Sequence, residues 1–258
     1  MSSAEAAVRR DRLIVAAGLL ALAALAWLSI AHMAATMRTH AGMSMSSAGP
    51  WDASETAGLA LMWIVMMMAM MIPSVTPVIL LFAGVSRRRR MEGVAAAPAA
   101  VFTLGYLLAW TGYAVLAAIT QSALHSAALL SPSMSSASPL LGGAILVVAG
   151  VYQWLPLKGA CLSHCRSPLG FFSTEWREGV SGALRMGFRH GSYCVGCCWA
   201  LMALLFVAGV MNLIWVAVIA GFVLAEKVVP NGRLLGRIAG AVLAGFGLWV
   251  LVGGRWVN

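Results

Sequence analysis

All five cysteines of this chain fall into two short segments, and each segment also carries a histidine. The first segment reads KGACLSHCRSP from residue 158, and the second reads HGSYCVGCCWALM from residue 190. Within each segment these side chains recur at intervals of three and four residues, which places them on one face of an α-helix. The predicted metal ligands are Cys161, His164, Cys165, His190, Cys194, Cys197 and Cys198.

Thiolate and imidazole groups are the ligands that zinc, copper(I) and iron–sulfur centres prefer, whereas hard cations prefer oxygen. Lys158, Arg166 and Arg189 lie close to the two segments and favour the thiolate, which is the form that binds metal. A single buried cysteine is often only a small apolar side chain. Because every cysteine of the chain is clustered with histidine, the pattern predicts a bound metal ion, with copper(I) first and zinc as the alternative.

Each segment offers three ligands, which is fewer than the four of a closed tetrahedral zinc site. The connecting stretch 166–189 is long enough to turn the chain back, so we expect the two segments to face each other and form one site. A different chemistry stays open at this point, because Cys194 and Cys197 form a C-x-x-C pair. That pair is also the pattern of a membrane thiol–disulfide oxidoreductase.

Methionines and one acidic residue mark a second candidate feature, a path for a soft ion. Thioether sulfur suits copper(I), and the candidate path is formed by Met62, Met66, Met67 and Met70. Glu226 is a further candidate, because an ionisable side chain inside an apolar run is often functional. The alternative for the methionines is adaptable packing. The alternative for Glu226 is an ion pair with Lys158 or Arg189.

The composition predicts that these residues are positioned by membrane-spanning helices. Of the 258 residues, 61% are hydrophobic and only 10% are charged, whereas soluble domains carry about 25% charged residues. Several apolar runs approach or reach the roughly 20 residues that a transmembrane helix needs. We therefore expect an all-α, polytopic bundle of about seven transmembrane helices. The predicted spans are 13–31, 57–82, 99–120, 138–156, 193–210, 212–229 and 236–253.

One membrane domain, 13–253, accounts for nearly the whole chain. It is flanked by a cytosolic N-terminal tail, 1–12, and a C-terminal tail, 254–258, and it contains a cytosolic Cys/His loop over 157–192. The first run is longer than the apolar part of a secretory signal, which favours a retained span over a cleaved signal. Within the loop, the stretch 173–188 predicts a short interfacial helix that turns Trp176, Leu184 and Phe188 toward lipid.

Charge predicts the orientation of these spans. With the N-terminus in the cytosol, all of the 17 Lys and Arg residues except Arg38 and Arg255 fall on the cytosolic side, as the positive-inside rule requires. The net charge of +9 is then explained by topology. Nucleic-acid binding is not expected, because the basic residues are scattered over loops without a recognisable binding motif.

The sequence contains no P-loop, no G-x-G-x-x-G and no catalytic triad, so an enzyme is less expected than a binding or transport protein. The function predicted from these residues is to bind a soft metal ion at the cytosolic face, for transport, handling or delivery. The expected partners are the lipid bilayer and a protein that donates or accepts the metal.

Several stretches resemble a bacterial family of predicted metal-binding integral membrane proteins, which is a domain of unknown function. They are MWIVMMMAMMIPSVTP, YQWLPLKGACLSHCRSP, MGFRHGSYCVGCCWALM and MNLIWVAVIAGFVLAEKVVP, and the resemblance extends from about Met62 to Pro230. It implies metal binding and a location in the bacterial inner membrane. The matching positions are Gln153, Lys158, Cys161, Cys165, Arg166, Gly187, His190, Gly191, Tyr193, Cys194, Gly196, Cys197, Cys198, Asn212, Glu226 and Lys227.

Overall fold

The computed structural model describes residues 3–40, 53–130, 136 and 138–253. These residues form helices joined by short connections, and no strand occurs among them beyond one isolated bridge between Leu130 and Ser136. The helices are α1 (Ser3–His40), α2 (Ala53–Met91), α3 (Ala99–Ser126), α4 (Pro139–Tyr152), α5 (Pro156–Arg166), α6 (Pro168–Glu175), α7 (Gly179–Ala203), α8 (Leu205–Ala208), α9 (Leu213–Val228) and α10 (Gly232–Leu251). The all-α class predicted from the sequence is therefore confirmed for the described residues.

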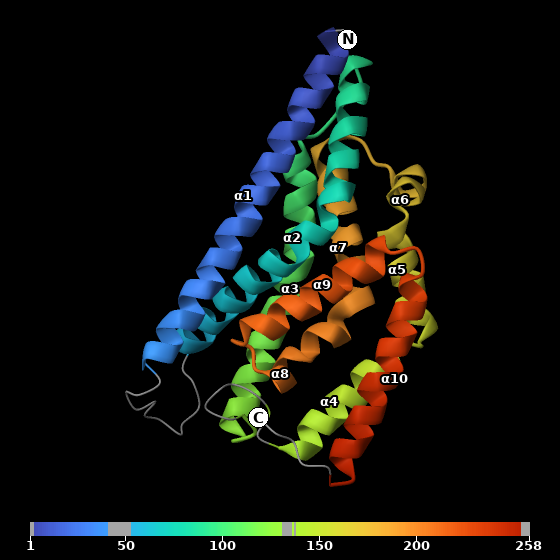
Figure 1. Ribbon diagram of the computed structural model, residues 1–258. Helices are drawn as coiled ribbons and strands as arrows, with labels where there is room; N and C mark the ends of the chain where they lie inside the picture. The colour runs from blue at the N-terminus through green and yellow to red at the C-terminus, as the bar shows by residue number, and fades with distance from the viewer. Residues whose placement is uncertain (1–2, 41–52, 131–135, 137, 254–258) are drawn as a thin grey trace.

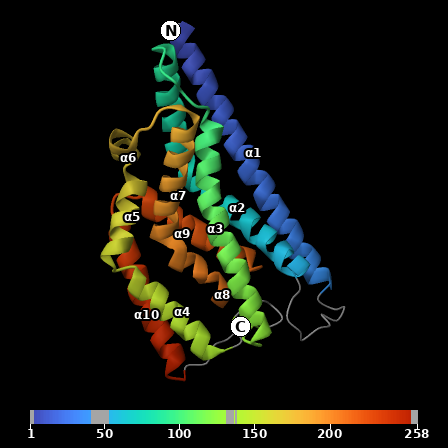
Figure 2. The same cartoon turned by 180° about the vertical axis from the view of Figure 1, so that it is seen from behind.

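Two groups of helices make up the molecule (Figure 1). Helices α1, α2, α3 and α7 pack in that order, and α4 packs along α10 on the other side. Figure 2 shows the pairing of α3 with α7 from behind. Helix α9 crosses between the two groups, and the short helices α5 and α6 connect α4 to α7. The segments that carry cysteine thus lie where the two groups meet.

Within the described residues, five helical stretches are long and apolar enough to cross a membrane, and they lie within α1, α2, α3, α7 with α8, and α10. Helices α4 and α5 pass the same test only as a pair, and they are bent by 64° at their junction. Helix α9 has 16 residues, which at 1.5 Å per residue spans about 24 Å, less than the roughly 30 Å hydrocarbon core. These helices support the prediction that the chain is a membrane protein. The count of seven spans and the orientation stay predictions.

The segment 157–192 is not an irregular loop, because α5, α6 and the first half of α7 occupy it. The prediction of a separate interfacial helix over 173–188 is wrong. Residues 176–178 are not helical, and the chain from Gly179 onward belongs to the long helix α7. Trp176 is half-buried and packs against Phe82, with ring centroids 5.6 Å apart.

Helices α3 and α7 approach each other closely because two glycines lie in their contact. A Cβ atom on Gly105 would come within 2.1 Å of the Leu184 carbonyl oxygen, and one on Gly187 within 2.0 Å of the Phe102 carbonyl oxygen. Small residues of this kind allow helix backbones to pack tightly in membrane proteins. This contact fixes the position of α7, the helix that supplies most of the cysteines.

Candidate metal centre

Three cysteines from two helices converge in the interior of the protein. The Sγ atoms of Cys165 on α5 and of Cys194 and Cys197 on α7 all lie within 4.8 Å of one another. The Cys165 and Cys197 sulfurs are 3.9 Å apart. All three side chains are buried, and the cysteines are free thiols. The predicted meeting of the two segments is therefore seen for these three residues.

Local sequence explains how each helix presents its sulfur. Helix α5 begins at Pro156, which suits the first turn because proline lacks an N–H and has a fixed φ. Its buried face carries Lys158, Leu162 and Cys165 at intervals of three and four residues. Helix α7 repeats the pattern with His190, Cys194 and Cys197 on its buried face. The periodicity read from the sequence therefore corresponds to the faces that become buried.

The other two cysteines do not join the three-sulfur group. Cys198 is buried but is not among the sulfurs that lie within 4.8 Å of one another, and its thiol donates a hydrogen bond to the Cys194 carbonyl oxygen at 2.9 Å. Cys161 is half-buried and packs against the α7 backbone at Gly196, where an added Cβ would lie 2.8 Å from its sulfur. The structure thus brings together three of the five predicted sulfur ligands.

The two predicted histidine ligands have different surroundings. His190 is buried one helical turn before Cys194, among the rings of Phe171, Phe102 and Tyr106, and its Nδ1 atom has no hydrogen-bond partner among the residues that the structure describes. His164 is half-buried, with its Nδ1 2.9 Å from the Ala160 carbonyl oxygen. Buried polar atoms are usually paired, so the free Nδ1 of His190 makes it the more suitable additional ligand.

A lysine that sequence reasoning did not assign to the centre lies directly beside it. Lys227 Nζ donates to Cys194 Sγ at 3.0 Å and to the Ser74 hydroxyl at 2.9 Å, and the Tyr106 hydroxyl is 3.1 Å from the same sulfur. An adjacent ammonium stabilises a thiolate. The position of Glu226 and Lys227 at the end of an apolar run indicated a buried charge. That Lys227 reaches Cys194 could not be read from the sequence, because it depends on the angle at which α9 crosses α7.

Glu226 lies in an ion pair, which was the alternative to a role in an ion path. Lys158 Nζ is 2.6 and 2.8 Å from the two Glu226 carboxylate oxygens and also donates to the Gln153 side-chain oxygen. Both side chains of the pair are almost fully buried. Arg189, the other proposed partner, instead pairs with Glu175 at 2.9 Å. The Lys158 ammonium compensates the charge of the buried Glu226 carboxylate, and the pair links α5 to α9.

The methionine face of α2 is part of the main hydrophobic core. Its buried members are Met62, Met66, Met67 and Met70. Helix α2 bends near its middle (Figure 1), in the part that contains Pro73 and Pro77, because proline interrupts helical hydrogen bonding. Ser74, next to this face, contacts Lys227. The methionines and the three cysteines thus belong to the same hydrophobic core, and packing explains the burial of the methionines.

The spacing of the three sulfurs fits one soft metal ion. Three sulfurs bonded at about 2.3 Å to an ion in their plane lie about 4.0 Å from one another, close to the 3.9 Å between Cys165 and Cys197. Thiolates select soft ions such as copper(I) and zinc. The donor set and the burial therefore fit a metal ion without a large rearrangement of the helices.

This combination defines an all-helical protein with several membrane-length apolar helices and a buried three-cysteine centre. The family described as "PpoB2: Copper chaperone" matches residues 60–250, and the chain belongs to this family. The resemblance noted from the sequence is thereby confirmed. No curated protein and no solved structure matches the chain. Family membership and the cysteine centre together support metal binding.

Proposed function

We propose that this protein holds copper(I) as cargo between Cys165, Cys194 and Cys197 and delivers it to an acceptor protein. The observation that carries the proposal is the convergence of three buried sulfurs from two helices within 4.8 Å. Copper is favoured over zinc because three thiolates suit a soft monovalent ion. The family's description names copper as well.

The surroundings of the centre support a carrier that releases its ion. The Lys227 ammonium contacts Cys194 and offsets the negative charge that thiolates bring into a buried site. Because His190 lies one turn from Cys194 with an unpaired Nδ1, it offers an additional ligand during transfer. We place the protein in the bacterial inner membrane with its N-terminus in the cytosol, which the distribution of basic residues supports.

Thiol–disulfide exchange is the competing function, and burial argues against it. A redox-active thiol pair must be reached by its substrate, whereas Cys194 and Cys197 are only 1% and 2% exposed. A C-x-x-C pair that cycled between thiol and disulfide would be found partly oxidised after purification in air. Titration of free thiols with and without denaturant measures this, and five free thiols would exclude such a disulfide.

Metal analysis of the full chain, purified in detergent under reducing conditions and loaded with copper(I), tests the proposal. The wild type should bind about one copper(I), and Cys165→Ser, Cys194→Ser and Cys197→Ser should each lower the copper content, because each removes one of the three sulfur ligands. Cys161→Ser is the matched control, since its sulfur lies outside the group and it should keep the wild-type content. Equal copper in Cys165→Ser and the wild type would refute the three-sulfur centre.

A further inference from the structure

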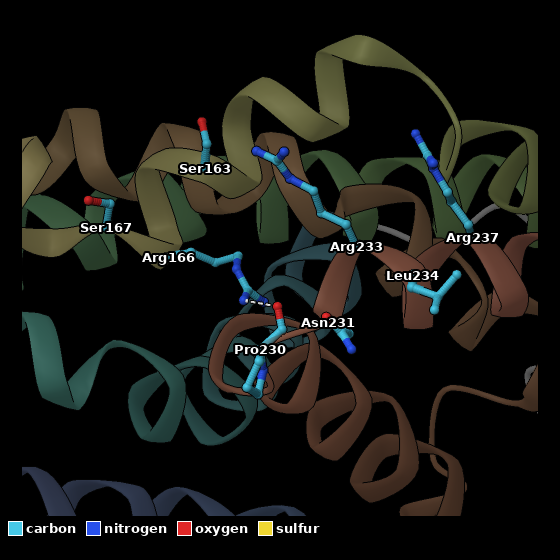
Figure 3. Close-up of a pocket in the computed structure, with 8 residues that line it drawn as sticks. All are labelled: Ser163, Arg166, Ser167, Pro230, Asn231, Arg233, Leu234 and Arg237. Atoms are coloured by element: carbon cyan, nitrogen blue, oxygen red, sulfur yellow. Dashed lines mark hydrogen bonds between the residues drawn. The ribbon is translucent and has the colours of Figure 1, made fainter.

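A basic pocket lies outside the metal centre, between the end of α5 and the start of α10 (Figure 3). It has a volume of about 650 Å³ and is lined by eight residues. Its polar lining residues are Ser163, Arg166, Ser167, Asn231, Arg233 and Arg237. No carboxylate is among the lining residues. The pocket is therefore lined by three arginines, two serines and an asparagine, with no opposing negative charge among its lining residues.

The three arginines differ in how much of their hydrogen bonding is already used. Arg166 donates to the backbone oxygens of Glu226 and Pro230, the latter at 2.9 Å, and so holds the α9–α10 turn in place. Arg233 and Arg237 have no ion pair or hydrogen bond in the described part of the chain. Two guanidinium groups are thus free to bind an anion, and guanidinium matches phosphate oxygens in a bidentate way.

Apolar side chains continue from the pocket along the same helix. Leu234, Ile238 and Val242 follow one another at intervals of four residues on α10, and they are 56%, 56% and 65% exposed. Leu234 also lines the pocket, where Figure 3 shows it beside Arg237. A free phosphate would use only the arginines. A phospholipid would use both features, with its headgroup at Arg233 and Arg237 and an acyl chain along the apolar row.

We propose that this pocket binds the phosphate group of an anionic phospholipid. The lipid would bridge α5 and α10, two helices that the chain itself joins mainly through Arg166 and the turn at Pro230. Positive charge attracts anionic headgroups, and basic pockets between membrane helices hold them specifically. The site is separate from the metal centre, since none of its lining residues is a proposed copper ligand.

Native mass spectrometry of the full chain in detergent, titrated with phosphatidylglycerol or phosphatidylcholine, tests this inference. The wild type should retain phosphatidylglycerol in preference, and the Arg233→Gln/Arg237→Gln variant should bind it about 30-fold more weakly, since each basic residue contributes about a factor of five. The variant Arg88→Gln/Arg90→Gln removes the same charge from exposed positions at the end of α2 and should keep the wild-type affinity. Copper content should be unchanged in all variants.

Inorganic phosphate, added as a competitor, shows whether the pocket binds the phosphate group of a lipid or a free phosphate ion. It should not displace phosphatidylglycerol at millimolar concentration, because it lacks the acyl chain that contacts Leu234 and Ile238. The Arg233→Lys/Arg237→Lys variant retains the charge and should preserve most of the preference. Equal phosphatidylglycerol binding by the wild type and Arg233→Gln/Arg237→Gln would overturn the proposal. Displacement by phosphate would overturn the lipid assignment in favour of a soluble anion.

Discussion

Replacing Lys158 by methionine leaves the Glu226 carboxylate without its partner inside the protein. The two side chains are 3% and 2% exposed, and the ammonium contacts both carboxylate oxygens at 2.6 and 2.8 Å. An added Cβ on Gly236 would lie 2.3 Å from one of these oxygens, so the carboxylate is tightly enclosed and has no room to move toward water. The charge therefore stays buried when its partner is removed.

The expected magnitude follows from this burial. Breaking a buried ion pair from one side costs about 3–5 kcal/mol, because an uncompensated charge remains, whereas replacing both partners by apolar groups is often close to neutral. Lys158→Met should therefore lower the free energy of unfolding by about 3–5 kcal/mol. The double variant Lys158→Met/Glu226→Met should recover most of that loss. Glu178→Gln, which breaks an exposed pair with Arg89 at 3.0 Å, should cost at most about 1 kcal/mol.

Unfolding in mixed detergent micelles, followed by tryptophan fluorescence and circular dichroism, measures these differences. Copper content gives a second readout, because Lys158 and Cys165 lie on the same buried face of α5. We expect Lys158→Met to lose copper together with stability and the double variant to regain both. If the double variant loses as much stability as Lys158→Met and Glu226→Met together, the two groups do not interact as described, and the reasoning fails.

Three further outcomes are expected. Lys227→Gln should weaken copper(I) affinity about 10- to 100-fold without unfolding the protein, because it removes the ammonium beside Cys194. Competition with a chelator measures the affinity, and an unchanged value would contradict this expectation. Gly187→Ala should destabilise the α3–α7 contact by about 1–3 kcal/mol in thermal unfolding, whereas Gly112→Ala, whose Cβ meets nothing within 4 Å, should not. If Met62, Met66, Met67 and Met70 only pack, replacing them together by leucine should keep both the fold and the copper content, since leucine and methionine have similar volumes. Loss of copper transfer while the cysteine centre still binds copper would instead support a thioether path.

Helical periodicity was sufficient to identify the faces of α5 and α7 that become buried. Cys165, Cys194 and Cys197 follow from it, because i, i+3 and i+4 spacing is a property of a single helix. The same spacing did not separate Cys198 from Cys197, which differ by only about 100° around α7. Which of them faces α5 depends on the angle at which the helices cross, and that angle is set by contacts such as Gly105 and Gly187.

Contacts between distant segments were less accessible from the sequence. Lys227 was not assigned to the metal centre from the sequence, whereas in the structure it reaches Cys194 across a separation of 33 residues. The break at residues 176–178 was also missed, since the stretch 173–188 has a continuous helical pattern of apolar residues. Hydropathy reports how apolar a run is, and not where packing ends one helix and begins the next.

The three converging sulfurs also determine how the chain is tied together. Cys165 and Cys194 are 29 residues apart (194 minus 165), with α6 between them. A metal ion held by both helices therefore closes a loop in the covalent chain, much as a disulfide does, and reduces the conformational freedom available to the unfolded state. If copper(I) is carried as proposed, the same ion is both cargo and cross-link, and its release should leave the protein less stable toward unfolding.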